Sequence, residues 1–150
     1  MRTWILALTV ILCLGVGFTA GLLTDTGTTW FLELNKPVIY PPGYLFGLVW
    51  TVLYLMMGVS LYLIIEKTKE RLPFLLFGAQ LVLNFLWTLI FFGLQNIILA
   101  IAEIIALWGM ILWTILTFKK YSKPAAILLV PYILWVTFAT VLTVWIYAIN

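Results

Sequence analysis

The chain of 150 residues is 65% hydrophobic and 9% charged, whereas a soluble domain has ~25% charged residues, so the composition excludes a soluble protein and indicates one dissolved in a lipid bilayer. The net charge of +3 lies in loops and forms no basic face with interleaved aromatic residues, which argues against a nucleic-acid partner. The sequence contains no histidine and a single cysteine, so we predict neither a metal centre nor a disulfide.

The first apolar run covers residues 4–23 and follows Arg2. A basic start, an apolar stretch and small residues near Ala20 are also typical of a cleaved signal peptide. Because the run is long enough to cross a bilayer, we expect a retained transmembrane helix.

Residues 24–43 form a segment that is rich in proline and aromatic side chains, among them Pro37, Pro41, Trp30 and Phe31. Prolines restrict the backbone, and aromatic rings provide surface to bury. We therefore expect a structured lid over one end of the molecule rather than a flexible linker.

Four further apolar runs cover residues 44–65, 73–94, 97–118 and 125–149. Only two polar residues separate the run that ends at residue 94 from the next, so these two helices must be antiparallel neighbours. Pro131 should bend the last helix. Together with the first run, these segments predict a single all-α domain, a five-transmembrane-helix bundle.

The basic residues are distributed unevenly in such a bundle. With five spans, every Lys and Arg except Lys36 falls on the side of the N-terminus. Loops rich in Lys and Arg stay in the cytoplasm. The sequence therefore predicts an N-terminus in the cytoplasm, a lid on the outside and a bacterial cytoplasmic membrane as the location.

Polar and aromatic side chains at helical spacing are the informative ones inside the spans, because apolar residues gain little by hiding from lipid. Three stripes carry them: Trp50 with Tyr54; Gln80 with Asn84 and Trp87; and Tyr132 with Trp135, Ala139 and Thr143. A bundle lined in this way would enclose a flat, mainly apolar ligand. The two amides are explained equally well as hydrogen bonds between helices.

Glu103 is the only ionisable side chain well inside a span, which makes it either a functional group or a hydrogen-bonded helix contact. Trp4, Trp145 and Tyr147 lie near span ends and are expected to anchor the helices at the membrane interface. Small-residue pairs such as Gly17 and Gly21 are explained by close packing within the bundle as well as by a dimer interface.

Several segments resemble one known family. Residues 29–31, 36–42 and 46–58 are TWF, KPVIYPP and FGLVWTVLYLMMG, and residues 80–87 and 129–139 are QLVLNFLW and LVPYILWVTFA. These motifs are similar to those of the tryptophan-rich sensory protein family, whose mitochondrial members are the translocator protein or peripheral-type benzodiazepine receptor. The match follows the family order along essentially the whole chain.

The resemblance implies a five-helix bundle, commonly a homodimer, with a pocket under the lid. Family ligands include protoporphyrin IX and other tetrapyrroles, cholesterol in some members, and synthetic benzodiazepine-type and isoquinoline ligands. Carried over to matching positions, the implied pocket consists of Phe31, Pro41, Trp50, Tyr54, Asn84, Trp87, Trp135, Ala139 and Thr143. Gln80 is added because it shares a helix face with Asn84.

Three positions depart from the family pattern. The lid has Val38, Ile39 and Tyr40 in a region that usually contains a tryptophan, and Thr143 replaces a common asparagine. No Lys or Arg follows Tyr147, so the cholesterol-contact pattern is missing and we do not predict cholesterol binding.

These observations lead to three functional hypotheses. The first is a receptor or sensor that binds porphyrin-type ligands, requires no cofactor and, lacking histidine, prefers the metal-free ring. The second is light-dependent oxidative degradation of bound porphyrin, in which Trp50 and Trp135 would be the catalytic side chains. The third, porphyrin or sterol transport, has little support because the chain lacks inverted repeats. Motifs of conventional enzymes, such as a phosphate loop or a nucleophile elbow, are absent.

Overall fold

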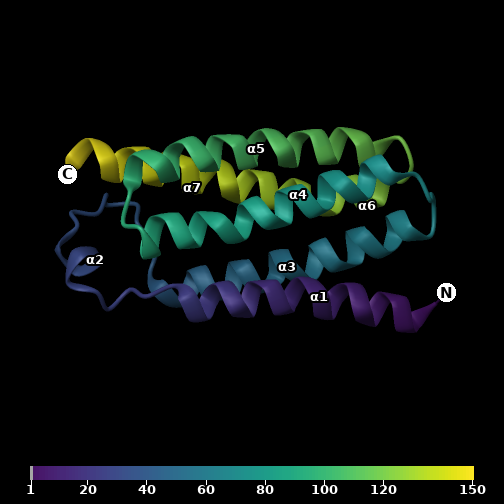
Figure 1. Cartoon of the computed structure of the whole chain (residues 1–150), viewed down its shortest axis with the longest axis horizontal. Helices are drawn as coiled ribbons and strands as arrows, with labels where there is room; N and C mark the ends of the chain where they lie inside the picture. The colour runs from purple at the N-terminus through teal and green to yellow at the C-terminus, as the bar shows by residue number, and fades with distance from the viewer. Residues whose placement is uncertain (1) are drawn as a thin grey trace.

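The computed structural model describes residues 2–150, which form helices and connecting turns without any strand. Five helices are long and apolar enough to cross a membrane. They are α1 (Thr3–Leu23), α3 (Gly43–Ile65), α4 (Arg71–Thr88) extended by η1 (Leu89–Gly93), α5 (Ile97–Lys119), and α6 (Lys123–Leu128) followed by α7 (Val130–Ile149). They lie side by side along the long axis, with the two chain ends at opposite ends of the molecule (Figure 1). The predicted all-α, five-helix membrane fold is confirmed.

The short helix α2 (Thr29–Glu33) lies in the lid, beyond the end of the bundle where α1 ends and α3 begins (Figure 1). Thr28 caps α2, because its Oγ1 accepts a hydrogen bond from the Phe31 amide at 3.2 Å. The prolines Pro37 and Pro41 are both buried. The lid is therefore an ordered part of the fold that covers one end of the helices.

The third span ends differently from the uniform helix expected from the sequence. Its last turn is a π-helix, in which the Leu94 amide donates to the Leu89 carbonyl at 2.9 Å. Gln95 then has a positive φ of 53°, and the Asn96 side chain caps α5 by accepting from the Leu99 amide at 3.0 Å. π-Turns inside membrane helices and elsewhere often mark functional sites. Here the turn brings the Phe91 ring into the interior, where it is 3% exposed.

The last span is broken where Pro131 predicted a bend. α6 ends at Leu128, and Leu129 has φ −91° and ψ −7° before α7 begins. Pro131 has no N–H for the carbonyl one turn earlier, so the helix cannot continue straight. The break lets α6 pack against both α3 and α5, while α7 continues along α5.

Buried side chains form a main core and a smaller cluster next to the lid. The main core includes Tyr54, Met57, Phe77, Ile111 and Tyr132. The second group, here called the lid cluster, consists of Phe31, Phe91, Ala100 and Ile146. The interior therefore has two groups of buried side chains along the bundle axis. The partly buried residues packed around the lid cluster include several aromatic ones.

Helices α1 and α3 approach most closely at glycines. A Cβ atom on Gly17 would overlap the Tyr54 ring, and one on Gly58 would lie 2.6 Å from the Cα of Val10. A Cβ on Gly21 would meet nothing within 4 Å. Gly17 is thus explained by packing within the bundle, as the sequence allowed.

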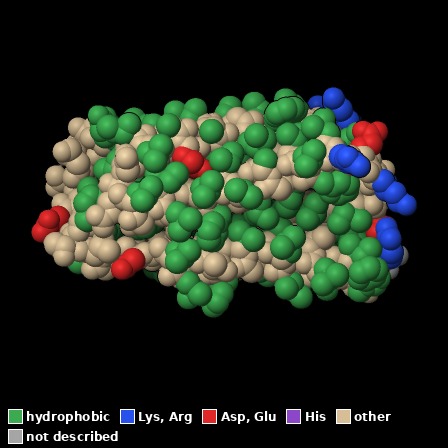
Figure 2. All heavy atoms as spheres, in the orientation of Figure 1, with side chains coloured by type: hydrophobic (Ala, Val, Ile, Leu, Met, Phe, Trp, Pro, Cys, Tyr) green, Lys and Arg blue, Asp and Glu red, His purple; other side chains and the backbone are tan. Residues whose placement is uncertain are grey.

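Charged groups occupy the two ends of the molecule. Figure 2 shows Lys and Arg side chains gathered at the end that carries the N-terminus, with mostly hydrophobic side chains and a few Asp and Glu over the rest of this face. Trp4 and Tyr147, near opposite ends, are 64% and 50% exposed, which suits interfacial anchors. Five apolar helices and this charge distribution make the chain an integral membrane protein.

Candidate functional site

A chain of hydrogen bonds crosses the interior of the bundle. The Tyr54 hydroxyl donates to Oδ1 of Asn84 at 2.5 Å, and Nδ2 of Asn84 donates to the Tyr132 hydroxyl at 2.8 Å. The Tyr132 hydroxyl donates to Oε1 of Gln80 at 2.7 Å. These four buried residues, here called the polar network, connect α3, α4 and α7. Because each bond joins two different helices, the network fixes the spacing of the three spans.

The amides of the polar network thus have partners within the protein. Gln80 and Asn84 therefore form hydrogen bonds between helices, which is one of the two roles considered for them from the sequence. Among residues 2–150, only Nε2 of Gln80 is left without an acceptor within the network, and its side chain is 1% exposed. A ligand contact for these amides stays a prediction.

Three tryptophans lie one helical turn from the polar network on the side of the lid. Trp50 precedes Tyr54 by four residues on α3, which runs away from the lid. Trp87 follows Asn84 on α4 and Trp135 follows Tyr132 on α7, and these two helices run towards the lid. Each tryptophan therefore lies on the lid side of its network residue. We call Trp50, Trp87 and Trp135 the tryptophan layer. Their rings come from three helices and stand between the polar network and the lid.

The rings of the tryptophan layer pack against aromatic neighbours. Trp50 lies 5.6 Å from Tyr54 and 6.2 Å from Tyr132, measured between ring centroids. Trp87 stacks on Phe91 at 5.0 Å, and Trp135 meets Phe46 edge-on at 5.7 Å. Such geometries add attraction beyond the buried area.

Two of these indoles bury a donor that nothing satisfies. The Nε1 atoms of Trp87 and Trp135 have no hydrogen-bond partner in the part of the chain that the structure describes. The two carboxylate oxygens of Glu103 are likewise buried without a partner. Unpaired polar groups are costly in an apolar interior, so they mark places where a further partner would be favourable.

The next turns of α7 towards the lid carry the small side chain of Ala139 and the hydroxyl of Thr143, which is already hydrogen-bonded. Ala139 is half-buried against the main core. The Thr143 hydroxyl donates to the Ala139 carbonyl at 2.7 Å, inside its own helix. Thr143 therefore offers a ligand only an acceptor, and Ala139 presents no more than a methyl group one turn from Trp135.

The lid closes this end of the bundle with aromatic and polar contacts. The Phe31 ring is 6% exposed and lies 5.5 Å from Phe92. Nζ of Lys36 donates to the Phe31 carbonyl at 2.9 Å and lies 4.4 Å from the centre of its ring. This Lys therefore caps α2 and cannot serve as a free charge at the same time.

The lid is also tied to the end of α7 by a pair of asparagines, here called the amide latch. The Asn35 amide donates to Oδ1 of Asn150 at 2.9 Å, and Nδ2 of Asn150 donates to the Asn35 carbonyl at 2.9 Å. Nδ2 of Asn150 also donates to the Ile146 carbonyl at 2.8 Å. Because both residues are exposed, water can compete for these hydrogen bonds.

An apolar groove of about 540 Å³ lies between α3 and α7. Its lining is entirely hydrophobic and includes Val49, Leu53 and Phe138, together with Trp135 of the tryptophan layer. Trp135 therefore borders both the interior of the bundle and a surface that faces lipid.

Comparison with known proteins identifies the family. The sequence model described as the TspO/MBR family matches residues 9–148. The chain belongs to the TspO/MBR family. It is 41% identical over 150 residues to the tryptophan-rich protein TspO of Chlorobaculum tepidum, covering 97% of this chain and 95% of that protein. It is 36% identical over 121 residues to the translocator protein of Ovis aries, covering 77% of this chain and 72% of that protein. The resemblance inferred from the motifs is confirmed.

The pocket residues predicted for this TspO/MBR chain fall into three groups in space. Tyr54, Gln80 and Asn84 belong to the polar network, and the three indoles form the layer above it. The remaining members lie on the lid side: Phe31, Pro41, Ala139 and Thr143. The predicted set is therefore layered, and its first group is engaged in structural hydrogen bonds.

Sequence reasoning placed Tyr132 on the right helix face but left it out of the pocket set, although it is the centre of the polar network. It also missed Phe91 and Phe46, which contact the tryptophan layer. Phe91 follows Trp87 by four residues and Phe46 precedes Trp50 by four, so the same helical spacing would have found both.

Proposed function

We propose that this TspO/MBR protein is a membrane receptor or sensor that binds protoporphyrin IX and other flat apolar ligands between the tryptophan layer and the lid. The observation that carries the proposal is the pair of buried, unpartnered indole N–H groups of Trp87 and Trp135 in an aromatic interior. The hydroxyls of Tyr54 and Tyr132 and the Asn84 amide below them are bonded to one another, so a ligand would rest on the network rather than enter it.

The chemistry of a porphyrin complements this arrangement. Its flat, apolar ring suits stacking against indoles and Phe91. Its carboxylates or ring nitrogens provide acceptors that the indole N–H groups lack, and satisfying a buried donor recovers its desolvation penalty. The chain has no histidine to ligate iron, so a metal-free ring is favoured over haem.

Binding requires the lid to move. Phe31 of α2 and Phe91 of η1 pack together in the lid cluster and so occupy the interior beneath the lid. The exposed amide latch gives the lid a point that can open without disrupting the main core. Closure of a lid over a bound ligand excludes water and strengthens the remaining polar contacts.

The test is a titration of the purified protein with protoporphyrin IX in the dark, followed by tryptophan quenching. Wild type should show saturable quenching, and Trp135→Phe should weaken binding about tenfold, since one hydrogen bond to the ligand is lost. Trp113→Phe is the matched control, because Trp113 is 52% exposed on α5 and should leave the affinity unchanged. Absence of saturable quenching in wild type would contradict the proposal.

A second candidate function is light-dependent oxidative degradation of the bound porphyrin, favoured by the contact of the Trp50 ring with two tyrosines, Tyr54 and Tyr132. Porphyrin absorbance under illumination, at saturating ligand, separates the two functions. Stable absorbance supports a receptor, whereas a new product spectrum that is lost in Trp50→Phe supports degradation. An unchanged rate in Trp50→Phe excludes a catalytic role for this indole.

We also propose that the protein is a homodimer in a bacterial cytoplasmic membrane with its N-terminus in the cytoplasm. The charge asymmetry supports this orientation. Labelling of a cysteine introduced at Lys36 or Lys67 with an impermeant reagent tests it in intact cells. Only the variant at Lys36 should react from outside.

A further inference from the structure

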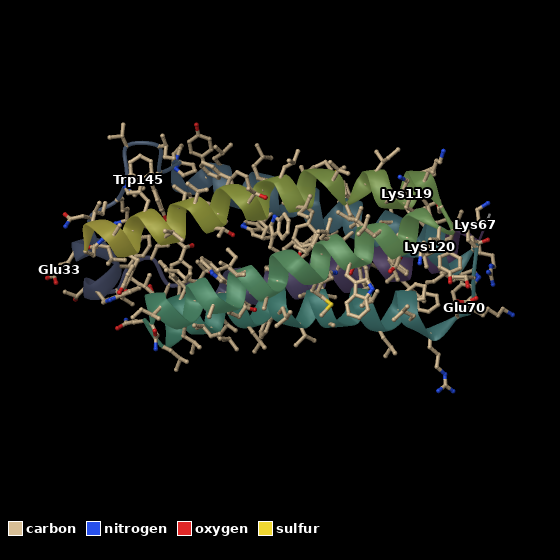
Figure 3. All side chains as sticks on the ribbon, turned by 90° about the horizontal axis from the view of Figure 1, so that it is seen from above. Glu33, Lys67, Glu70, Lys119, Lys120 and Trp145 are labelled. Carbon is tan, nitrogen blue, oxygen red and sulfur yellow. The ribbon has the colours of Figure 1, made fainter. Side chains whose placement is uncertain are left out.

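The end of the bundle opposite the lid carries a dense group of cations. Six basic side chains from the α3–α4 and α5–α6 turns are exposed there, and together we call them the basic end: Lys67, Lys69, Arg71, Lys119, Lys120 and Lys123. Figure 3 shows Lys67, Lys119 and Lys120 at the same end of the molecule as Glu70, with Glu33 and Trp145 at the other. Two turns far apart in sequence thus form one charged face.

The acidic residues near this face do not neutralise it. Glu66 forms an ion pair with Arg2 at 3.0 Å, the ion pair found within residues 2–150. Glu70 accepts a hydrogen bond from the Tyr121 hydroxyl at 2.5 Å. The other acids on exposed segments, Asp25 and Glu33, belong to the lid at the opposite end. Six cations against the one carboxylate of Glu70, with Glu66 paired to Arg2, leave the basic end with a clear excess of positive charge.

The bond between Tyr121 and Glu70 joins the two turns. Tyr121 lies between Lys120 and Lys123 in the α5–α6 turn, while Glu70 lies between Lys69 and Arg71 at the start of α4. The hydrogen bond to Glu70 raises the pKa of the Tyr121 phenol above its ordinary value, which reflects the stabilisation of the protonated, donating form by the carboxylate. Each turn carries cations on both sides of the bonded residue. The bond therefore holds two sets of cations next to each other.

We propose that the basic end is a binding site for the headgroup of an anionic phospholipid, assembled by the contact between Tyr121 and Glu70. A phosphate group carries negative charge and several acceptor oxygens, which two groups of Lys and Arg from adjacent turns can share. This site is independent of the proposed porphyrin pocket, which lies at the other end of the bundle.

The short turns favour a lipid over a soluble polyanion. α3 ends at Ile65 and α4 begins at Arg71, while α5 ends at Lys119 and α6 begins at Lys123. So few residues outside the helices leave the cations at the level of the lipid headgroups instead of projecting them into water. Lys and Arg at helix ends extend their charged groups towards that level.

The experiment measures the thermal midpoint and the number of bound lipids of the full chain, in detergent, as phosphatidylglycerol or phosphatidylcholine is added. Lipids retained by the protein are counted by native mass spectrometry. Wild type should bind phosphatidylglycerol in preference to phosphatidylcholine, and high salt should reduce the preference. No porphyrin is present, so the result is separate from the test of the proposed function.

Two variants distinguish a built site from general attraction. Replacing Lys119, Lys120 and Lys123 together by Gln removes three cations from the basic end. The affinity for phosphatidylglycerol should therefore fall by about tenfold or more. Tyr121→Phe keeps every charge but separates the turns, and should weaken binding about fivefold. Glu33→Gln, which changes one exposed charge at the lid, is the control and should behave as wild type.

Equal binding of both lipids by wild type would overturn the proposal, as would an unchanged preference in the triple variant. A Tyr121→Phe protein with wild-type lipid binding would overturn the assembled site. Full stabilisation by inorganic phosphate alone would overturn the assignment to a lipid. The midpoint of each variant in phosphatidylcholine shows whether it is folded.

Discussion

The polar network and the tryptophan layer are neighbours in the same bundle, yet they satisfy their polar atoms very differently. In the network, Tyr54, Asn84 and Tyr132 bond to one another across three helices. One turn towards the lid, the indole N–H groups of Trp87 and Trp135 are buried with no partner among the described residues. Within residues 2–150, the first region satisfies all its hydroxyl and amide groups except Nε2 of Gln80, whereas the second leaves both buried indole donors without a partner.

This difference separates a structural role from a binding role for similar side chains. Hydrogen bonds between helices in a bilayer stabilise a bundle only if donors and acceptors meet. Buried groups without partners reduce stability and are retained where another molecule supplies the partner. Variants of the network should therefore affect folding first, whereas variants of the layer should affect binding first.

The largest effect is expected for Gly17→Ala, because the added Cβ would overlap the Tyr54 ring. Displacing Tyr54 also disturbs its bond to Asn84. The free energy of unfolding should fall by about 3 kcal/mol. Thermal unfolding in detergent measures it. Gly21→Ala, one turn along the same helix, has free space and should not lower the midpoint; equal losses in both variants would contradict this explanation.

Tyr132→Phe removes the centre of the polar network while keeping the ring. Asn84 would lose an acceptor and Gln80 a donor, so we expect a loss of about 2 kcal/mol. Tyr44→Phe is the matched control, since Tyr44 is 78% exposed. If the two variants unfold at the same temperature, the network does not stabilise the bundle.

Glu103→Leu should have the opposite sign. Glu103 lies on the buried face of α5 between Ala100 of the lid cluster and Leu107 of the main core, and its oxygens have no partner among residues 2–150. Replacing an unpaired buried carboxyl by an apolar side chain should stabilise the ligand-free protein by about 1 kcal/mol. Glu33→Leu, at an exposed position, should give no such gain. A lower midpoint for Glu103→Leu would show that the acid is a structural contact.

The smallest effect is expected for Asn150→Ala, which removes the amide latch. Exposed hydrogen bonds of this kind contribute about 0.5 kcal/mol each, so global stability should hardly change. Hydrogen exchange of the lid peptides should nevertheless become faster, since the lid opens more often. Thr26→Ala is a control in the same segment. Unchanged exchange in Asn150→Ala would mean that the aromatic contacts alone hold the lid.

Much of this protein was predictable from composition and spacing. Long apolar runs can satisfy their backbone in a bilayer only as helices, so the five spans follow from the sequence. Loop charges sorted the basic residues to one end, and Pro131 indicated the break between α6 and α7. The family followed from motifs in the lid and in three of the spans.

Other features required the tertiary structure. Helical spacing placed Gln80 and Asn84 on one face of their helix. It could not identify their partners across the bundle, because spacing within one helix carries no information about the rotation of its neighbours. The same gap hid Tyr132 as the centre of the network and Tyr121 as the link between two basic turns. The sequence by itself determined which residues face inward and how many helices span the membrane, because both depend on periodicity and length within one segment. Which buried polar atoms are satisfied was decided only by packing, because a hydrogen bond depends on ångström distances between segments far apart in the chain.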